Sequence, residues 1–433
     1  MEFKLESKEY YNLITCLPEE ILGKDYIVAT YFYRSTSEID PFEKAKTFAI
    51  GQTLGTWVPV PGLTRDLYKK YGGRLVSIYD IPPVELTKDI PPETFHIIQI
   101  AFPDSNFSPQ LPILLTTLLG NDVSTSAQLK LLDITFSKKF LMHFKGPKFG
   151  VDGVYKLLGI KRRPIVLNMI KPCLGYTPEE GAEIFKAVAM GGVDIIKDDE
   201  LLSDTEYNPI EKRVKLYKKV AMDVQNETGH LTRYCVNITD RPDRMIEHAH
   251  RAVEAGADFL MVNFLTTGIS SLQILAEDDS INIPILAHYA TAGSLTESPF
   301  TGISTPLLLG KLSRIAGADM CMFSSPYSTY PFLRRKYIQI ADTQKKPLYN
   351  ILPTLPTVGG GVHPNSAAQI VKDLGKEVVL ATGGAIIGHP LGPTEGARSM
   401  MQAVEALAQD LDLYEVANNS GYEALKISLE KWK

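Results

Sequence analysis

The sequence predicts an α/β fold in two parts, a C-terminal (β/α)8 TIM barrel preceded by an N-terminal ferredoxin-like α+β domain. Two observations carry this prediction. After residue 137, eight apolar runs alternate with helix-like segments, and eight such units in about 250 residues are typical of a TIM barrel. Before it, the order is strand, helix, strand, strand, helix, strand, which is the split βαβ arrangement. We therefore expect domains at 1–137 and 138–433.

The N-terminal domain is predicted from segments that alternate apolar and polar residues, as in a sheet with one covered face. A helical segment follows the first strand and another follows the third. The expected strands are 25–34, 74–81, 95–102 and 129–136, and the expected helices are 41–51 and 109–120.

The barrel is predicted from apolar strands that are each followed by a helical pattern. A turn of the form Gly-Val-Asp or Gly-Ala-Asp recurs before several strands and marks the passage from helix to strand. One or two helices are expected to close the chain at 412–433. The expected barrel strands are 163–170, 193–199, 232–239, 258–264, 283–290, 319–325, 346–353 and 377–384.

Composition excludes several classes of protein. The net charge of −5 leaves no basic footprint, so neither nucleic acid nor an anionic membrane is an expected partner. No apolar run approaches the ~20 residues of a membrane span, and the polar N-terminus predicts no signal peptide. Four scattered cysteines suit a reducing compartment. We expect a globular cytoplasmic protein.

The segment GGVDIIKDDE (191–200) is the most informative in the chain. Lys197 and Asp199 are two residues apart on a strand, so their side chains point to the same side, and Glu200 follows at the turn. In one interpretation, the lysine ammonium pairs with the two acids. In the other, Lys197 is carbamylated by CO2 and supplies an oxygen ligand, and three oxygen ligands suit Mg²⁺. Spacing alone leaves both open.

Other strand ends carry further candidates, because active sites of TIM barrels lie where strands end. Lys171 would have a lowered pKa beside a metal ion and carry a proton, or it would pair with Asp199. His288 contacts substrate or is a hydrogen-bonded core histidine. Two glycine clusters predict a phosphate site, with plain turns as the alternative: Gly359, Gly360 and Gly361, and Gly383 and Gly384.

GGVDIIKDDE closely resembles the carbamylation motif of RuBisCO and the RuBisCO-like proteins, and NMIKPCLG resembles the T-I-K-P-K-L-G motif of that family. The resemblance spans nearly the whole chain. It implies Mg²⁺ held by carbamylated Lys197 with Asp199 and Glu200, and a catalytic Lys171. It also implies a homodimer in which the N-terminal domain of one subunit completes the barrel mouth of the other. Thr56 and Trp57 of the G-T-W motif, together with Asn121, would act across that interface.

Several positions depart from RuBisCO. Cys173 stands where the family has a second lysine, and Thr291 stands where an arginine grips a substrate phosphate. The segment FSSPYSTYPFLRRKY has no counterpart of the lysine that grips CO2 or O2. Gly51 replaces the glutamate that partners that lysine. Both halves of one ion pair are lost together, so we expect no CO2 fixation.

What remains predicts formation of an enediolate from a phosphorylated keto compound. Segments such as AHYATAGSLTESPF resemble 2,3-diketo-5-methylthiopentyl-1-phosphate enolases of methionine salvage, but those enolases carry a lysine base where this chain has Asn121. Asparagine cannot act as that base. The departure favours decarboxylation of a 3-oxo sugar acid phosphate, of the 3-oxo-isoapionate 4-phosphate type, with the enolase as the alternative. A non-catalytic stress-response protein is a third possibility, which the intact KDDE segment disfavours.

Overall fold

The computed structural model describes residues 8–55 and 60–432. These residues fall into two compact units, one up to Phe144 together with Thr291–Leu308, and one of Lys145–Ala290 together with the chain from Leu309 on. The domain limit that the sequence places at 137 remains a prediction. Thr291–Leu308, which the sequence assigns to the barrel, joins the first unit in the structure.

The first unit has the predicted ferredoxin-like order of elements. Its sheet runs β10-β4-β1-β3-β2, and β1 lies antiparallel to both β3 and β4. The two predicted helices are α3 (Pro41–Gly51) and α5 (Leu111–Leu118). Side chains of alternate residues along β1 are buried, which confirms the covered face. The four main strands are β1 (Tyr26–Thr36), β2 (Arg74–Ile81), β3 (Glu93–Pro103) and β4 (Lys130–Thr135).

A fifth strand comes from far along the chain. β10 (Gly302–Ile303) pairs in parallel with β4. Lys130 Nζ donates a hydrogen bond to Thr296 O at 2.6 Å and so ties the same segment to β4. This addition has no signal in the local sequence, because a two-residue strand shows no periodicity.

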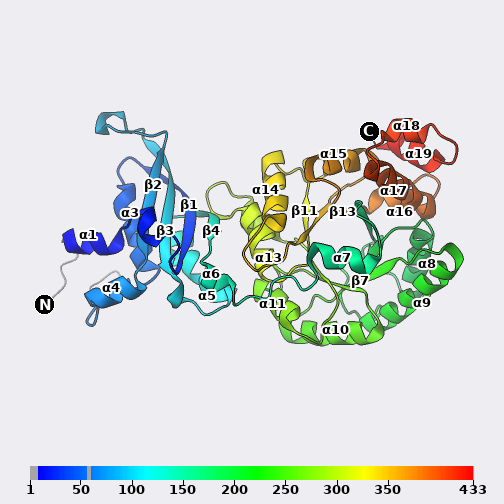
Figure 1. The fold of residues 1–433 in the computed structure, drawn as a ribbon, viewed down its shortest axis with the longest axis horizontal. Helices are drawn as coiled ribbons and strands as arrows, with labels where there is room; N and C mark the ends of the chain where they lie inside the picture. The colour runs from blue at the N-terminus through cyan, green and yellow to red at the C-terminus, as the bar shows by residue number, and fades with distance from the viewer. Residues whose placement is uncertain (1–7, 56–59, 433) are drawn as a thin grey trace. The chain divides into compact units, whose positions relative to one another are not determined.

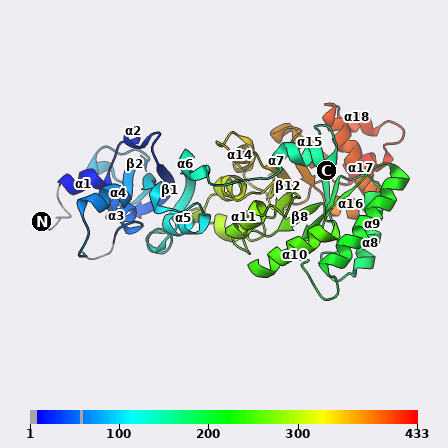
Figure 2. The same cartoon turned by 60° about the horizontal axis from the view of Figure 1, so that its bottom comes forward.

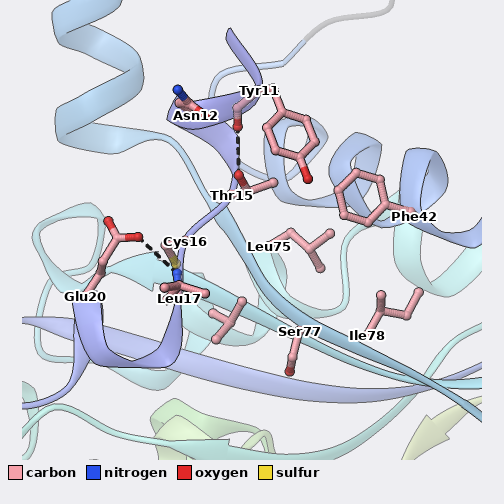
Figure 3. A pocket seen from close by; sticks show the side chains of 11 residues that line it. Tyr11, Asn12, Thr15, Cys16, Leu17, Glu20, Phe42, Leu75, Ser77 and Ile78 are labelled. Carbon is pink, nitrogen blue, oxygen red and sulfur yellow. Dashed lines mark hydrogen bonds between the residues drawn. The ribbon is translucent and has the colours of Figure 1, made fainter. Parts of the chain in front are cut away.

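A pocket of about 470 Å³ lies entirely within the first unit. Figure 3 shows it between the rings of Tyr11 and Phe42 and the strand residues Leu75 and Ser77. Glu20 at its rim already accepts a hydrogen bond from Leu17 N. None of the predicted site residues lines it. Short helices complete the unit: α1 (Lys8–Ile14), α2 (Pro18–Ile21), α4 (Arg65–Tyr71), α6 (Lys138–Leu141) and α12 (Ala292–Thr296).

The second unit is a closed barrel of eight parallel strands, in the order β11-β12-β13-β5-β6-β7-β8-β9. Figures 1 and 2 show α8, α9 and α10 following one another around its outside. The predicted TIM barrel is therefore confirmed. Its strands are β5 (Ile165–Met169), β6 (Ile195–Lys197), β7 (Arg233–Asn237), β8 (Phe259–Val262), β9 (Ile285–Ala287), β11 (Met320–Ser324), β12 (Leu355–Gly359) and β13 (Val379–Ala381).

The helices of the barrel unit alternate with these strands. Figure 1 shows two of the C-terminal helices, α18 and α19, beside α17. No helix among the described residues is long and apolar enough to cross a membrane. The helices are α7 (Gly150–Leu158), α8 (Pro178–Ala189), α9 (Ile210–Thr228), α10 (Pro242–Ala255), α11 (Ile269–Glu277), α13 (Ser313–Ile315), α14 (Arg334–Lys345), α15 (Pro364–Leu374), α16 (Gly384–Ile387), α17 (Pro393–Ala408), α18 (Leu413–Ala417) and α19 (Glu423–Lys431).

The seventh barrel strand was placed wrongly by the sequence. It is β12 (Leu355–Gly359), not 346–353. The apolar run KPLYNILP is a turn instead, closed by a single bridge between Leu348 and Ile351. Pro356 lies inside the true strand, and proline argues against a central strand on local grounds. β12 pairs with β11 and β13, and this pairing leaves no signal in the local sequence pattern.

The recurring Gly-x-Asp turns have a common structural role at the start of barrel strands. Asp194 N donates to Val166 O at 3.1 Å, and Asp194 Oδ2 accepts from Val166 N at 2.9 Å. Asp319 clamps Ile285 of β9 in the same two-point way, at 3.1 and 2.9 Å. Asp258 does so on β7. Each aspartate therefore sets the register of its strand against a neighbouring strand.

Candidate active site

The interior of the barrel is apolar up to the strand ends. Leu167 and Met169 of β5 belong to one buried cluster with Ile195 of β6 and Cys235 of β7. Lys197 follows Ile195 by two residues, so its side chain continues the same inward row. It pairs in register with Met169 on one side and Cys235 on the other. A lysine is thereby enclosed among apolar side chains.

Lys197 is fully buried. Its Nζ donates a hydrogen bond to Asp198 O at 2.8 Å and lies 3.7 Å from Glu200 Oε2. Burial lowers the pKa of Lys197, because an ammonium is poorly solvated there. If Lys197 paired with both acids, its Nζ would lie close to both carboxylates. Of the two, it is near Glu200 only, and that contact is long.

Asp199 is also fully buried and pairs with a different lysine. Its Oδ2 lies 2.5 Å from Lys171 Nζ, and its Oδ1 accepts a hydrogen bond from Leu201 N at 3.1 Å. Burial opposes the charge of Lys171, but the hydrogen bonds to Asp199 and Cys173 and the charge of Asp199 together outweigh it, so the pKa of Lys171 is raised. The lowered pKa expected for Lys171 beside a metal ion stays a prediction, and in this structure Lys171 forms the ion pair with Asp199.

His288 faces the same carboxylate as Lys197. Its Nε2 lies 3.6 Å from Glu200 Oε2, although β6 and β9 are not neighbours in the barrel. Burial lowers the pKa of His288 well below its usual range, so the ring is neutral. Its Nδ1 accepts a hydrogen bond from Ala290 N at 3.2 Å, which leaves the ring proton on Nε2. The structure thus brings Lys197, Glu200 and His288 together.

The side chains present fit a magnesium ion on one condition. Within residues 8–55 and 60–432, no three His, Cys, Asp or Glu side chains lie close enough to hold a metal ion. Asp199 and Glu200 therefore need an oxygen donor from a third residue. Burial lowers the pKa of Lys197 and so favours the neutral amine, which is the form that adds to CO2. Carbamylation of Lys197 would supply that oxygen, and hard cations prefer oxygen.

The two glycine turns follow neighbouring strands, and the second lies beside Lys171. Gly360 and Gly361 follow β12, and both have a φ of +88°, which favours glycine. Gly383 and Gly384 follow β13, which lies between β12 and β5. A Cβ on Gly383 would lie 3.8 Å from Lys171 Cε. The backbone of the Gly383–Gly384 turn, which carries no side chain, therefore lies close to Lys171 at the ends of the barrel strands.

The loop between β11 and α14 is held against the first glycine turn. Ser324 Oγ lies 2.5 Å from Ser328 Oγ and donates a hydrogen bond to Tyr330 O at 2.7 Å. Thr329 N donates to Gly360 O at 3.1 Å. No lysine occurs between β11 and the start of α14, so the loop offers no cation to a bound gas molecule.

The remaining candidates lie in the first unit. Thr56 and Trp57 fall outside the described residues. Asn121 is exposed, just after α5. A Cβ at Gly51 would lie 2.3 Å from Asp122 Oδ2, so a glutamate at this position would have to displace that carboxylate. The loss of the glutamate is thus matched by a neighbour that occupies its space.

Sequence reasoning missed the polar residues that support the KDDE segment. Asn237 Nδ2 donates to Glu200 O at 3.1 Å, and Asn263 Nδ2 donates to the same carbonyl at 2.9 Å. Both asparagines come at or just after barrel strand ends, which is the one signal that could have found them.

Comparison with known proteins agrees with this architecture. Residues 150–326 and 336–432 match the catalytic domain of the ribulose bisphosphate carboxylase large chain, and residues 19–140 match its N-terminal domain. A ribulose bisphosphate carboxylase-like protein of Archaeoglobus fulgidus is 44% identical over 409 residues, covering 93% of both chains. A 2,3-diketo-5-methylthiopentyl-1-phosphate enolase of Bacillus cytotoxicus is 39% identical, covering 93% of this chain and 97% of its own.

Solved structures share the whole fold. A RuBisCO-like protein (MtnW) from Alicyclobacillus acidocaldarius superposes with a TM-score of 0.87 at 34% identity, covering 94% of this chain and 100% of that one. A dimeric archaeal RuBisCO from Hyperthermus butylicus superposes with a TM-score of 0.86 at 28% identity, covering 98% and 99%.

A ferredoxin-like sheet followed by a TIM barrel, with a lysine and two acids ending the second barrel strand, defines proteins of the RuBisCO type. The chain belongs to the ribulose bisphosphate carboxylase large-chain family, among its RuBisCO-like members.

Proposed function

We propose that this protein is a magnesium-dependent enzyme that enolises a phosphorylated diketone of the 2,3-diketo-5-methylthiopentyl-1-phosphate type and does not fix CO2. The observation that carries the proposal is the fully buried Lys197 beside Asp199 and Glu200. A buried amine with a lowered pKa suits carbamylation better than a structural ion pair. The enolases at 38–39% identity, which match over 93% of the chain, support this substrate class.

Magnesium held by carbamylated Lys197, Asp199 and Glu200 would polarise the substrate oxygens and so acidify the adjacent C–H. The chain's own residues would do the rest. The backbone N–H groups of the two glycine turns, Gly360–Gly361 and Gly383–Gly384, would bind the substrate phosphate. Lys171 stands beside that phosphate site. The apolar barrel floor, including Met169, would exclude water.

Lys171 Nζ holds a proton in this structure, since contact with Asp199 raises its pKa. It can therefore donate a proton to a substrate oxygen. To act as the base that takes the C–H proton, Lys171 would first have to separate from Asp199 Oδ2 and release its own proton, as it could when Asp199 holds the metal. His288 is neutral with its proton on Nε2, so it would donate a hydrogen bond into the site and help orient substrate. Asn121, from a partner subunit, would contribute a hydrogen bond and no base.

Decarboxylation of a 3-oxo sugar acid phosphate is the second candidate. Asn121 favours it, because loss of CO2 forms an enediolate without removal of a C–H proton. Relatives named as 2,3-diketo-5-methylthiopentyl-1-phosphate enolases, which match over 93% of this chain, weigh against it. A non-catalytic protein is disfavoured by the buried Lys197 and Asp199 with Glu200 beside them, since a scaffold does not need such a group.

The two reactions are distinguished by one incubation. The purified protein, activated with Mg²⁺ and bicarbonate, is mixed in D2O with each candidate substrate and followed by NMR. Deuterium uptake or enol formation from the diketone without CO2 release supports the enolase. Release of CO2 from the sugar acid phosphate supports the decarboxylase. Carboxylation of ribulose bisphosphate would contradict both, and full activity of Lys197→Ala would contradict the role of the carbamate.

A further inference from the structure

Asp198 is the middle residue of the KDDE segment and faces away from the barrel interior. Strand geometry alternates side chains, so Asp198 points outward between two residues that point inward. Its Oδ1 accepts a hydrogen bond from Tyr234 OH at 2.5 Å. Its Oδ2 accepts from Arg213 Nε at 3.1 Å and from Asn237 N at 2.9 Å. The carboxylate is thus held by β7 and by α9.

Asp198 and Arg213 are both fully buried. Arg213 Nε also donates to Tyr234 OH at 3.1 Å, and Nη2 lies 3.1 Å from Asp198 Oδ2. The guanidinium further donates to two backbone carbonyls, Asn208 O at 2.7 Å and Asn237 O at 3.4 Å. A buried ion pair contributes little net stability, because desolvation offsets the attraction, and replacing such a pair by apolar side chains is often neutral. These hydrogen bonds together hold the backbone at Asp198 in a single position.

That backbone carries the groups of the predicted metal centre. Lys197 Nζ donates its hydrogen bond to Asp198 O, at 2.8 Å. Asn237, which holds Asp198 through its backbone N–H, also holds the next turn, because its Nδ2 donates to Glu200 O at 3.1 Å. The same network therefore fixes the chain on both sides of Asp199.

We propose that Asp198, held by Arg213 and Tyr234, is a positioning residue that aligns Lys197 and Asp199 for carbamylation and metal binding. The inference rests on the proposed function, since it assumes that these residues form the magnesium site. Loosening the network should weaken the response to CO2 and Mg²⁺ more than it weakens the fold. Residues behind the ligands of a metal change its affinity by about 10- to 100-fold in other proteins.

The test compares two neighbouring tyrosines. Tyr234→Phe removes a donor to Asp198 and an acceptor from Arg213 Nε, and keeps the ring. Tyr217→Phe is the matched control, because Tyr217 OH is buried without a hydrogen-bond partner among the described residues, in a ring 4.9 Å from that of Tyr234. Each variant is titrated with Mg²⁺ by calorimetry in ¹³C-bicarbonate, and the carbamate is followed by ¹³C NMR.

We expect Tyr234→Phe to bind Mg²⁺ about tenfold or more weakly and to lose carbamate signal at limiting CO2, with Tyr217→Phe like wild type. Equal behaviour of the two variants would overturn the inference. A wild-type protein without any carbamate signal would instead overturn the proposed function, and this inference with it. If Tyr234→Phe fails to fold, Arg213→Lys, which keeps the positive charge, takes its place with the same expected loss and the same contradicting result.

Discussion

Lys197 and Lys171 have opposite electrostatic situations although they end neighbouring strands. Lys171 Nζ lies 2.5 Å from Asp199 Oδ2 and has a raised pKa, whereas Lys197 Nζ lies 3.7 Å from the Glu200 carboxylate and has a lowered pKa. Strand alternation and family resemblance predicted the inward lysine and acids. They could not predict which lysine Asp199 would pair with, because that depends on distances across two strands.

The burial of Lys197 has a cost that depends on pH. Above the unfolded lysine pKa of about 10.4 the amine is neutral in both states. As pH falls below that value, the unfolded chain takes up a proton that the folded chain resists, so the free energy of unfolding decreases until the folded pKa is reached. In CO2-free buffer we expect Lys197→Met to be about 1 kcal/mol or more stable than wild type at pH 7. Urea unfolding at pH 7, 8, 9 and 10 measures the difference.

The difference between Lys197→Met and wild type should shrink towards pH 10. Lys212→Met, at an exposed pair with Glu179, is the control and should stay within about 0.5 kcal/mol of wild type. A stability gain for Lys197→Met that is constant over this pH range would mean that the amine is not penalised by burial.

At the scale of elements, the sequence predicted the strands that follow the repeating strand–helix alternation. It missed the strands that form only by pairing with segments distant in the chain. Seven of the eight barrel strands lie where the alternation placed them. β12 was missed because it contains Pro356 and because the apolar run 346–353 resembles a strand more closely. β10 was missed because a strand of two residues shows no alternation of apolar and polar residues. Asp198 was passed over for a similar reason: its partner Arg213 lies on the following helix, with no local signal.

The Gly-x-Asp clamps should carry much of the barrel's closure. Asp319 Oδ1 accepts from Phe149 N at 2.6 Å and Gly150 N at 2.9 Å, and its Oδ2 accepts from Ile285 N at 2.9 Å. Asp319→Ala would leave these buried donors unsatisfied, and we expect a loss of about 3 kcal/mol or more in denaturant unfolding. Asp279→Ala, at a surface pair, should change stability by less than about 0.5 kcal/mol. Similar values for the two variants would refute the clamp.

The misread run 346–353 owes its shape to one buried arginine. Arg314 donates to Leu352 O at 2.7 Å, to Ile351 O at 2.6 Å and to Lys346 O at 2.6 Å. Burial lowers the pKa of Arg314 to about 10, so the guanidinium is still charged at pH 7. These backbone carbonyls accept hydrogen bonds from the Arg314 side chain and not from a neighbouring strand. The apolar run 346–353 therefore forms a loop.

Arg314→Met should free that loop. We expect a stability loss of at least about 2 kcal/mol and early chymotrypsin cleavage after Tyr349, which is exposed at 58%. Arg335→Met, on the exposed face of α14, should leave the digestion pattern unchanged. If the two variants are digested at the same rate, the loop does not depend on Arg314.

At the scale of the whole molecule, the predicted site is incomplete within one barrel. Family resemblance assigns Asn121 to the barrel mouth of a partner subunit, and a dimeric archaeal RuBisCO shares the fold. Each dimer would then contain two sites, each built from the barrel of one subunit and the N-terminal domain of the other. The assembly can be tested by combining a variant that lacks the metal-binding lysine with one that lacks Asn121.

A heterodimer of Lys197→Ala with Asn121→Ala, purified through two different affinity tags, should regain about half of the wild-type activity per dimer. One of its sites carries both substitutions, and the other carries neither. A heterodimer of Lys197→Ala with Asp199→Ala is the control: both substitutions lie in barrels, so every site keeps one defect and no activity should return. If the first heterodimer is as inactive as the second, Asn121 does not act across the subunit interface.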